Sequence, residues 1–294
     1  MPELPDVAIY VERLAALFGG RPLTRLRIGG PFVLKSVDPP PDEFEGRRLE
    51  GVERLGKRIV MAFEGEHFAV VHLMVAGRLR LRDPGATIPR KRGLAAFDFP
   101  DGTVLFTEEG TRKRASLHLE RGRDAVAAHD RGGIEPLEMS REDLAHVLAA
   151  ERHTLKRSLT DPRLVSGIGG AYADEIMHRA GVGPLTLTDR LDDDEIDRLH
   201  AAIGDVLTEW VDRLRDEVGD GFPEKVTAFH PEMAVHGRFG EPCPVCGAPV
   251  QRIRYASNET NYCAGCQTGG RILADRALSR LLKDDFPRDL ADLE

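Results

Sequence analysis

The sequence predicts a multidomain α+β fold: an N-terminal β-sandwich with a leading helix, then a helical domain, then a small module built on four cysteines. Short apolar runs separated by turn signals fill residues 23–119, a pattern typical of an antiparallel sandwich or barrel. Apolar residues then recur at helical spacing, and all four cysteines fall within residues 243–266. We therefore expect domains at 1–130, 131–236 and 237–270, followed by a helical tail at 271–294.

The individual elements follow from local patterns. A leading amphipathic helix is predicted over residues 6–18 and should end at Gly19. Its apolar face consists of Val7, Tyr10, Val11, Leu14 and Phe18. Seven strand-like runs follow, at residues 23–28, 51–55, 58–63, 68–75, 78–82, 94–99 and 103–106. Ser140 and Asp143 should cap the first helix of the second domain, and apolar spacing from Ile196 to Val218 predicts a longer helix.

Charge and hydropathy exclude some classes of protein. No apolar run approaches the roughly 20 residues that span a membrane, and the chain does not start with the basic segment of a signal peptide. The net charge is −8, and residues 186–220 carry all of it, with 12 acidic against 4 basic side chains. A solvated helix face explains that acidic run. Residues 251–280 are basic, with a net charge of +3, so a nucleic-acid partner remains compatible with the composition.

The cysteines form a metal-binding pattern. Their spacing, C-x2-C-x16-C-x2-C, is made by Cys243, Cys246, Cys263 and Cys266. Two such pairs complete a tetrahedral site, which predicts one structural zinc ion rather than disulfides. An empty or redox-active dithiol site is the alternative, although no thioredoxin-like pattern accompanies it. Residues 250–255 and 261–262 should form a hairpin between the two pairs.

A glycine-rich turn at residues 166–170 opens a helix. Exposed amides at such a helix start bind phosphate, helped by the helix dipole. Lys156 and Arg157 lie upstream and would add positive charge. A plain packing turn is the alternative interpretation.

The N-terminus offers a nucleophile. Removal of Met1 would leave Pro2 with a secondary α-amine, and free α-amines titrate near pH 8. Attack of this amine on a sugar C1′ gives an iminium that is necessarily cationic and serves as an electron sink. Glu3 lies beside it as a candidate acid/base.

Five segments together carry a family resemblance. They are MPELPDV at 1–7, GKRIV at 56–60, HLMVAGRLR at 72–80, GIGGAYADEI at 167–176 and YCAGCQ at 262–267. Over nearly the whole chain and in the same order, they resemble the formamidopyrimidine-DNA glycosylase/endonuclease VIII family. The chain is identified as a divergent member.

The resemblance implies a β-sandwich, a helix–two-turn–helix domain and a zinc finger that bind damaged DNA and flip out a damaged, often oxidised base. It implies a bifunctional glycosylase and AP lyase in which Pro2 attacks C1′, Glu3 assists sugar ring opening, and β/δ-elimination cuts the strand. Lys57 would bind the phosphate and sugar beside the lesion. The other DNA-contact candidates are His72, Arg112, Arg114, Lys156, Tyr172 and Arg254. We expect a cytoplasmic, nucleoid-associated monomer that uses no small-molecule cofactor.

The chain departs from the family at DNA-facing positions. Val75 stands where a gap-filling methionine is common, and the loop at 107–114 has no aromatic residue. Gly170 replaces a phosphate-binding asparagine, and Asn258 replaces the finger arginine, a role that Arg254 is placed to take over. Such changes imply a different lesion preference or lower activity.

Two other functions compete with the glycosylase. A relative that binds lesions without efficient catalysis would explain Gly170 and Asn258, but not the retention of Pro2, Glu3 and Lys57. A zinc-ribbon module of transcription or translation would explain the cysteines and nothing else.

Overall fold

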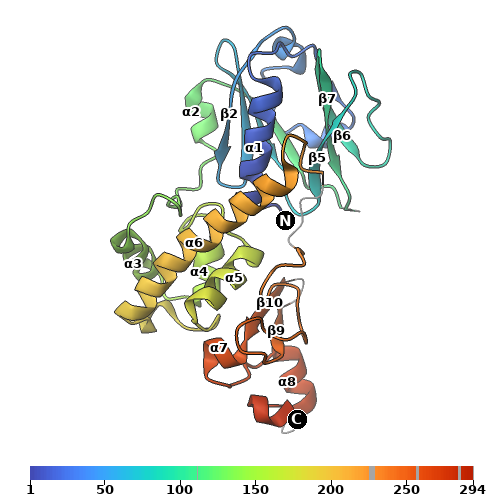
Figure 1. The fold of residues 1–294 in the computed structure, drawn as a ribbon. Helices are drawn as coiled ribbons and strands as arrows, with labels where there is room; N and C mark the ends of the chain where they lie inside the picture. The colour runs from blue at the N-terminus through green and yellow to red at the C-terminus, as the bar shows by residue number, and fades with distance from the viewer. Residues whose placement is uncertain (111, 225–228, 256–257, 284–285, 294) are drawn as a thin grey trace. The chain divides into compact units, whose positions relative to one another are not determined.

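A computed structural model describes residues 1–110, 112–224, 229–255, 258–283 and 286–293. The chain forms two compact units (Figure 1). The first unit contains Met1–Arg131 and Trp210–Thr227, and the second contains Gly132–Glu209 and Ala228–Glu294. The long helix α6, Asp193–Val218, contributes residues to both units. The four domain ranges expected from the sequence remain predictions.

The first unit begins with helix α1, Leu4–Phe18, which starts two residues before the predicted bound. The early start has a local cause, because the backbone N–H of Glu3 donates to Asp6 Oδ2 at 2.7 Å and thereby caps the first turn. The apolar face is buried as the spacing predicted, with Val11 only partly covered, and it packs against strands β2, Leu49–Leu55, and β3, Arg58–Phe63. The helix ends at Gly19, as expected.

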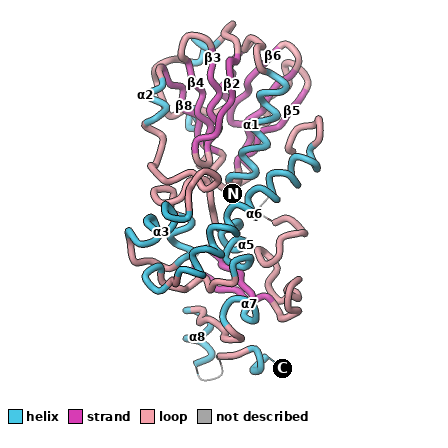
Figure 2. Tube along the Cα trace, turned by 60° about the vertical axis from the view of Figure 1, so that its left-hand side comes forward, coloured by secondary structure: helices cyan, strands magenta, loops and turns pink. Residues whose placement is uncertain are grey.

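Two antiparallel four-stranded sheets make up the rest of the first unit (Figure 2). One sheet has the order β1-β6-β7-β5, and its strands are Arg25–Ile28, Gly93–Phe99, Gly102–Glu108 and Gly77–Arg82. The other has the order β2-β3-β4-β8, with strands Leu49–Leu55, Arg58–Phe63, His67–His72 and Ser116–Arg121. Three short helices complete the unit: η1 at Pro31–Val33, η2 at Pro41–Phe44 and α2 at Arg123–Ala127.

The two sheets share one core, which identifies the predicted sandwich or barrel as a sandwich. Met61 and Val71 of one sheet and Phe97 and Phe106 of the other belong to the same buried cluster. Alternation along each strand sends every second side chain into this cluster. The fold class is therefore confirmed. Strand β8 is an eighth strand beyond the seven predicted ones.

The second unit is helical up to the finger. Its helices before α6 are α3 at Arg141–Ala150, α4 at Leu155–Thr160, α5 at Gly170–Ala180 and η3 at Thr188–Arg190. The predicted cap of α3 is confirmed, since Ser140 Oγ accepts from the Asp143 N–H at 3.1 Å. The finger and tail consist of β9 at Val250–Tyr255, β10 at Asn258–Cys263, α7 at Ala264–Thr268, α8 at Arg276–Leu282 and η5 at Leu290–Leu293. Strand β10 is longer than the predicted 261–262.

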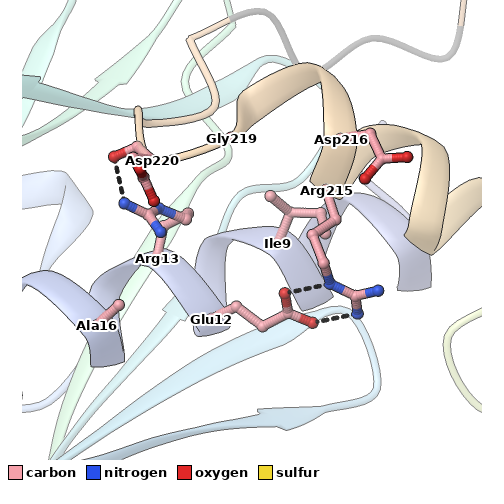
Figure 3. Close-up of a pocket in the computed structure, with 8 residues that line it drawn as sticks. All are labelled: Ile9, Glu12, Arg13, Ala16, Arg215, Asp216, Gly219 and Asp220. Atoms are coloured by element: carbon pink, nitrogen blue, oxygen red, sulfur yellow. Dashed lines mark hydrogen bonds and ion pairs between the residues drawn. The ribbon is translucent and has the colours of Figure 1, made fainter.

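Within the first unit, the C-terminal end of α6 is held against α1 by ion pairs (Figure 3). Arg215 binds Glu12 through Nε and Nη2, at 2.9 and 2.8 Å, and Arg13 Nε donates to the carbonyl of Gly221 at 2.7 Å. Glu12, Arg13 and Arg215 border a cavity of about 540 Å³. Arg215 pairs with Glu12, and Arg13 binds backbone carbonyls, so these side chains join α1 to the end of α6. Within the described residues, no helix has the length and apolarity to cross a membrane.

Candidate functional site

The N-terminus of the first unit is a buried, charged pocket. Pro2 is buried, and Glu3 is only 2% exposed at the start of α1. Burial lowers the pKa of the Met1 amino group; Glu3 and Asp6 oppose that shift, and Arg78 and Lys57 add to it. An amine in these surroundings is more readily deprotonated, which is the state that a nucleophile needs.

Lys57 belongs to the same pocket although it is distant in sequence. It lies in the turn between β2 and β3, and burial lowers the pKa of its ammonium group while Glu3 raises it. The electrostatic interaction between Lys57 and Glu3 means that the fold brings Pro2, Glu3 and Lys57 together. A lysine here places a hydrogen-bond donor beside the amine and the carboxylate.

Asp6 is the most strongly perturbed carboxyl of the pocket. Burial raises its pKa to about 7, against a hydrogen bond from the Glu3 backbone that lowers it. The side chain is 2% exposed. A carboxyl group with this pKa can take up or release a proton near neutral pH, and it lies one turn of helix away from Glu3.

The raised pKa of Asp6 predicts a pH-dependent loss of stability. The pKa of Asp6 in the folded protein, about 7, lies above its ordinary value of 3.8. The contribution of the protonated carboxyl to the free energy of unfolding is therefore fully present below about pH 4 and is lost by about pH 7. We expect Asp6→Asn, which keeps an acceptor for the Glu3 N–H, to gain stability over the unsubstituted protein as pH rises from 4 to 7. The difference should be on the order of 4 kcal/mol at its largest and then level off. Thermal melts across this pH range check it; a difference independent of pH would contradict it.

His72 and Val75 lie at the end of β4 and in the turn that follows. The backbone N–H of Met74 donates to His72 Nδ1 at 2.9 Å. Burial, followed by the cations Arg58 and Lys57, lowers the pKa of His72 to about 4, so the ring is neutral and carries its proton on Nε2. The Nε2–H group can serve as a hydrogen-bond donor. Val75 is 59% exposed at the tip of the turn.

Two further residues shape this turn. A Cβ on Gly77 would lie 2.2 Å from the carbonyl oxygen of Leu73, so the turn accepts only glycine there. Arg78 donates to the carbonyls of Gly77 and Val75, at 2.6 and 3.4 Å. The guanidinium thus stays close to the turn while also acting electrostatically on the N-terminal pocket.

The loop after β7 carries Arg112 and Arg114, and both side chains are exposed. Glu108, which is 2% exposed, anchors the loop because its carboxylate accepts from the backbone N–H of Arg114 at 2.9 Å and of Ala115 at 3.3 Å. Thr111 lies outside the described residues. Beside this anchor, Arg112 and Arg114 present two exposed guanidinium groups.

In the second unit, the glycine turn opens α5 as predicted. Gly170 is its first residue, and a Cβ added there would meet no atom within 4 Å, so a larger side chain fits. Tyr172 is 1% exposed and packs in the core. Lys156 is held by the fully buried Asp174 at 2.7 Å and by the carbonyl of Glu259 at 3.0 Å. Its charge therefore stabilises the junction between α4, α5 and β10.

The four cysteines meet in the finger. All four Sγ atoms lie within 4.8 Å of one another, with Cys243 and Cys266 at 3.8 Å and Cys246 and Cys263 at 3.3 Å. A tetrahedral zinc ion with Zn–S distances near 2.3 Å separates its sulfurs by about 3.8 Å, so the set fits that ion. Burial raises the pKa of the Cys263 thiol to about 11, and a bound cation would remove that proton.

A histidine supports the cysteine cluster from the helical part. His178 of α5 is buried, and its Nε2 lies 3.3 Å from Cys243 Sγ. Burial lowers the pKa of His178, so the ring is neutral and can donate one hydrogen bond to the sulfur. Contacts of this kind orient metal ligands.

The finger hairpin holds Arg254 and Asn258. Arg254 Nε lies 3.1 Å from Glu259 Oε2, directly across the two strands, and its side chain is 61% exposed. Asn258 is exposed at the start of β10, opposite Tyr255. Residues 256 and 257, between the strands, lie outside the described part of the chain.

Comparison with known proteins agrees with this geometry. The chain matches "Formamidopyrimidine-DNA glycosylase N-terminal domain" over residues 1–117, "Formamidopyrimidine-DNA glycosylase H2TH domain" over 133–219 and "Zinc finger found in FPG and IleRS" over 240–269. A formamidopyrimidine-DNA glycosylase of Solibacter usitatus is 32% identical over 271 residues, which cover 91% of this chain and 99% of the relative. The chain belongs to the formamidopyrimidine-DNA glycosylase family. This confirms the membership in the formamidopyrimidine-DNA glycosylase/endonuclease VIII family that the sequence motifs predicted.

Other family members give the same result. The formamidopyrimidine-DNA glycosylase of Chloroflexus aurantiacus is 34% identical over 279 residues, covering 91% of this chain and 98% of its own. The solved Lactococcus lactis enzyme, non-covalently bound to DNA that contains an AP site, has 25% identity and a TM-score of 0.79. That comparison covers 90% of this chain and 99% of the solved one.

The candidate residues of this glycosylase-family chain thus fall into two groups, one in each unit. The first unit holds Pro2, Glu3, Lys57, His72, Val75, Arg112 and Arg114. The second holds Lys156, Gly170, Tyr172, Arg254, Asn258 and the four cysteines. Sequence reasoning missed Asp6 and Arg78, although both lie in quoted motifs. The available signals were that Asp6 lies three residues after Glu3 and that Arg78 directly follows Gly77.

Proposed function

We propose that the protein is a bifunctional DNA glycosylase and AP lyase of base excision repair that removes damaged, oxidised bases from DNA. Family membership supports the glycosylase activity, and the composition of the N-terminal pocket supports the lyase. The observation that carries the proposal is that Glu3, Lys57 and Arg78 act electrostatically on the N-terminal amino group, next to the buried Pro2. A zinc ribbon of transcription or translation would leave this pocket and the matched N-terminal domain unexplained.

The proposed reaction starts at the amine of Pro2 after Met1 is removed. The amine nitrogen forms a bond to C1′, the bond from C1′ to the base breaks, and the base leaves with a proton. Glu3 serves as the acid/base during sugar ring opening. Ring opening breaks the C1′–O4′ bond and leaves an iminium that withdraws electrons. Loss of a C2′ proton then breaks the bond from C3′ to its oxygen in β-elimination, and loss of a C4′ proton breaks the bond from C5′ to its oxygen in δ-elimination. Asp6, with a pKa of about 7, is available to hold the proton that the amine gives up.

The remaining candidates would position DNA. The neutral His72 ring would donate Nε2–H to a phosphate oxygen, and Lys57 would bind the phosphate and sugar beside the lesion. Exposed Val75 would fill the space left by the flipped base. Arg112 and Arg114 would contact the backbone from the loop that Glu108 anchors. The buried Tyr172 and the paired Lys156 would act by holding α5 and the finger in place.

The four cysteines would hold one structural zinc ion. The ion supplies the cross-link between the two cysteine pairs that a hairpin of this size needs to stay folded. Cys243 additionally receives the contact from His178.

A panel of duplex oligonucleotides with defined lesions tests the function. We expect excision of at least one oxidised base and strand cleavage at abasic sites, measured by denaturing gel under single-turnover conditions. Tight binding of lesion DNA without excision or cleavage would identify the protein as a lesion-binding relative instead.

The finger makes a quantitative prediction about DNA affinity. Arg254 already pairs with Glu259, so Asn258→Arg should add a free cation for one phosphate contact. We expect binding of abasic-site DNA to tighten about tenfold, and the slope of log affinity against log salt to steepen by about 0.9. Fluorescence anisotropy over a salt series measures both. The matched control is Arg254→Ala. If Asn258→Arg has no effect while Arg254→Ala causes a large loss, the phosphate contact belongs to Arg254.

A further inference from the structure

A second group of metal-ligating side chains lies in the first unit, away from the four cysteines. It consists of His118 and Glu120 on β8 and His129, two residues after the end of α2. One ligand atom from each lies within 4.8 Å of the other two. His129 Nε2 is 2.8 Å from Glu120 Oε1, and His118 Nδ1 is 3.9 Å from the same oxygen. Nothing in the proposed glycosylase reaction uses these residues.

The fold explains why these three side chains meet. Along β8, Leu117 and Leu119 point into the sandwich core, so His118 and Glu120 point to the opposite face of the sheet. Helix α2 covers part of that face, where its Val126 packs with Phe68 and Val70. The chain leaving α2 then returns His129 to β8, with its ring centroid 4.6 Å from that of His118. The ligands therefore come from two separate segments, strand β8 and the chain that follows α2.

The chemistry of the set is that of a transition-metal site. Two imidazoles and one carboxylate form the ligand set of one class of zinc sites, in which a fourth position holds water. Tetrahedral coordination at about 2.1 Å separates ligand atoms by about 3.4 Å. The observed 2.8 and 3.9 Å fall on either side of this value, and both histidine side chains are only partly exposed, at 27% and 15%. Small side-chain rotations would bring the ligand atoms to the separation that a bound ion requires.

We propose that His118, Glu120 and His129 form a second divalent transition-metal site, of zinc-binding chemistry, that cross-links β8 to the segment after α2. The site stands independently of the proposed glycosylase function. Glu120 is its only anionic ligand, and the cations Arg58 and Lys35 act electrostatically on His118. The site should therefore bind zinc more weakly than the four cysteines do, and a chelator should empty it first.

The competing explanation is a plain hydrogen bond between His129 and Glu120. The chain offers a matched control for it, because His153 Nε2 lies 2.7 Å from Glu151 Oε2 and its side chain is 19% exposed. Among the described residues, His153 and Glu151 are not part of any group of three metal-ligating side chains. This pair thus has the hydrogen bond without the third ligand.

Zinc content of the full-length protein tests the proposal. After incubation with zinc and removal of free metal, we expect two zinc ions per chain, and one in His118→Ala and Glu120→Gln; His153→Ala should keep two. In titrations the second site should weaken about tenfold or more in both variants. Cobalt substitution distinguishes the two sites, since only the cysteine site gives thiolate charge-transfer absorption. Circular dichroism checks that each variant is folded.

Two results would overturn the proposal. One zinc per chain in the unsubstituted protein means that the cluster is a hydrogen-bonded group only. A second zinc that persists in His118→Ala and Glu120→Gln means that the ion binds elsewhere on the surface. Because neither measurement involves DNA or catalysis, the outcome is separate from that of the glycosylase assay.

Discussion

Glu3→Gln should lower the rate of base excision by about 10²–10⁴-fold, the usual contribution of a positioned acid/base. Cleavage of a preformed abasic site should fall much less, because that substrate has already lost its base. The substitution is nearly isosteric, and Glu3 caps α1 through its backbone N–H, which glutamine retains. Single-turnover rates on lesion DNA and on abasic-site DNA, measured with the same protein, give the two numbers.

Lys57→Ala is the comparison for Glu3→Gln, because a residue that binds the phosphate and sugar should affect both activities together. Glu12→Gln controls for charge on the same helix, since Glu12 pairs with Arg215 on the surface. Equal losses of excision and abasic cleavage in a folded Glu3→Gln protein would contradict the role of Glu3 as the acid/base of sugar ring opening during base excision.

Cys263→Ser should release the zinc ion of the finger and weaken DNA binding by about tenfold or more, the loss expected for one or more charge-assisted contacts. Cys263 is fully buried at the end of β10, so its loss opens both the metal site and the hairpin. Zinc content and anisotropy titrations measure the two effects.

The only tryptophan provides the control for Cys263→Ser. Trp210 is 4% exposed and belongs to the first unit, so its fluorescence reports the unfolding of the sandwich unit. We expect this transition to stay close to that of the unsubstituted protein. Unchanged zinc content, or simultaneous loss of the tryptophan transition, would be inconsistent with a separate structural metal site.

Local patterns predicted much of the fold correctly. Strands of the sandwich alternate apolar and polar side chains or form short apolar runs between turns, and the cap of α3 needs only Ser140 and Asp143. The cysteine cluster follows from spacing alone, because two C-x2-C pairs leave few arrangements that satisfy four thiols. The five quoted sequence segments also predicted the family to which the chain belongs.

The parts that the sequence did not predict depend on contacts between distant segments. Strand β8 was missed because its outward face carries His118 and Glu120 and contributes only two core leucines. Asp6 gains its pKa of about 7 from burial, which no local pattern reveals. The pairing of Lys156 with Asp174, 18 residues later, follows from the packing of α4 against α5, and the predicted DNA contact of Lys156 stays a prediction. The DNA contacts, the monomeric state and the cytoplasmic location stay predictions.

The central claim is that the N-terminal amine of Pro2 is the nucleophile, and borohydride trapping on abasic-site DNA tests it most directly. Borohydride reduces only a Schiff base, so a covalent protein–DNA adduct requires an amine that has attacked C1′. Protein with a free Pro2 should form the adduct efficiently. Protein with an uncleaved N-terminal extension should bind the same DNA with similar affinity and form no adduct. Undiminished trapping by the extended protein would contradict the account and assign the nucleophile to another amine, with Lys57 the first to test.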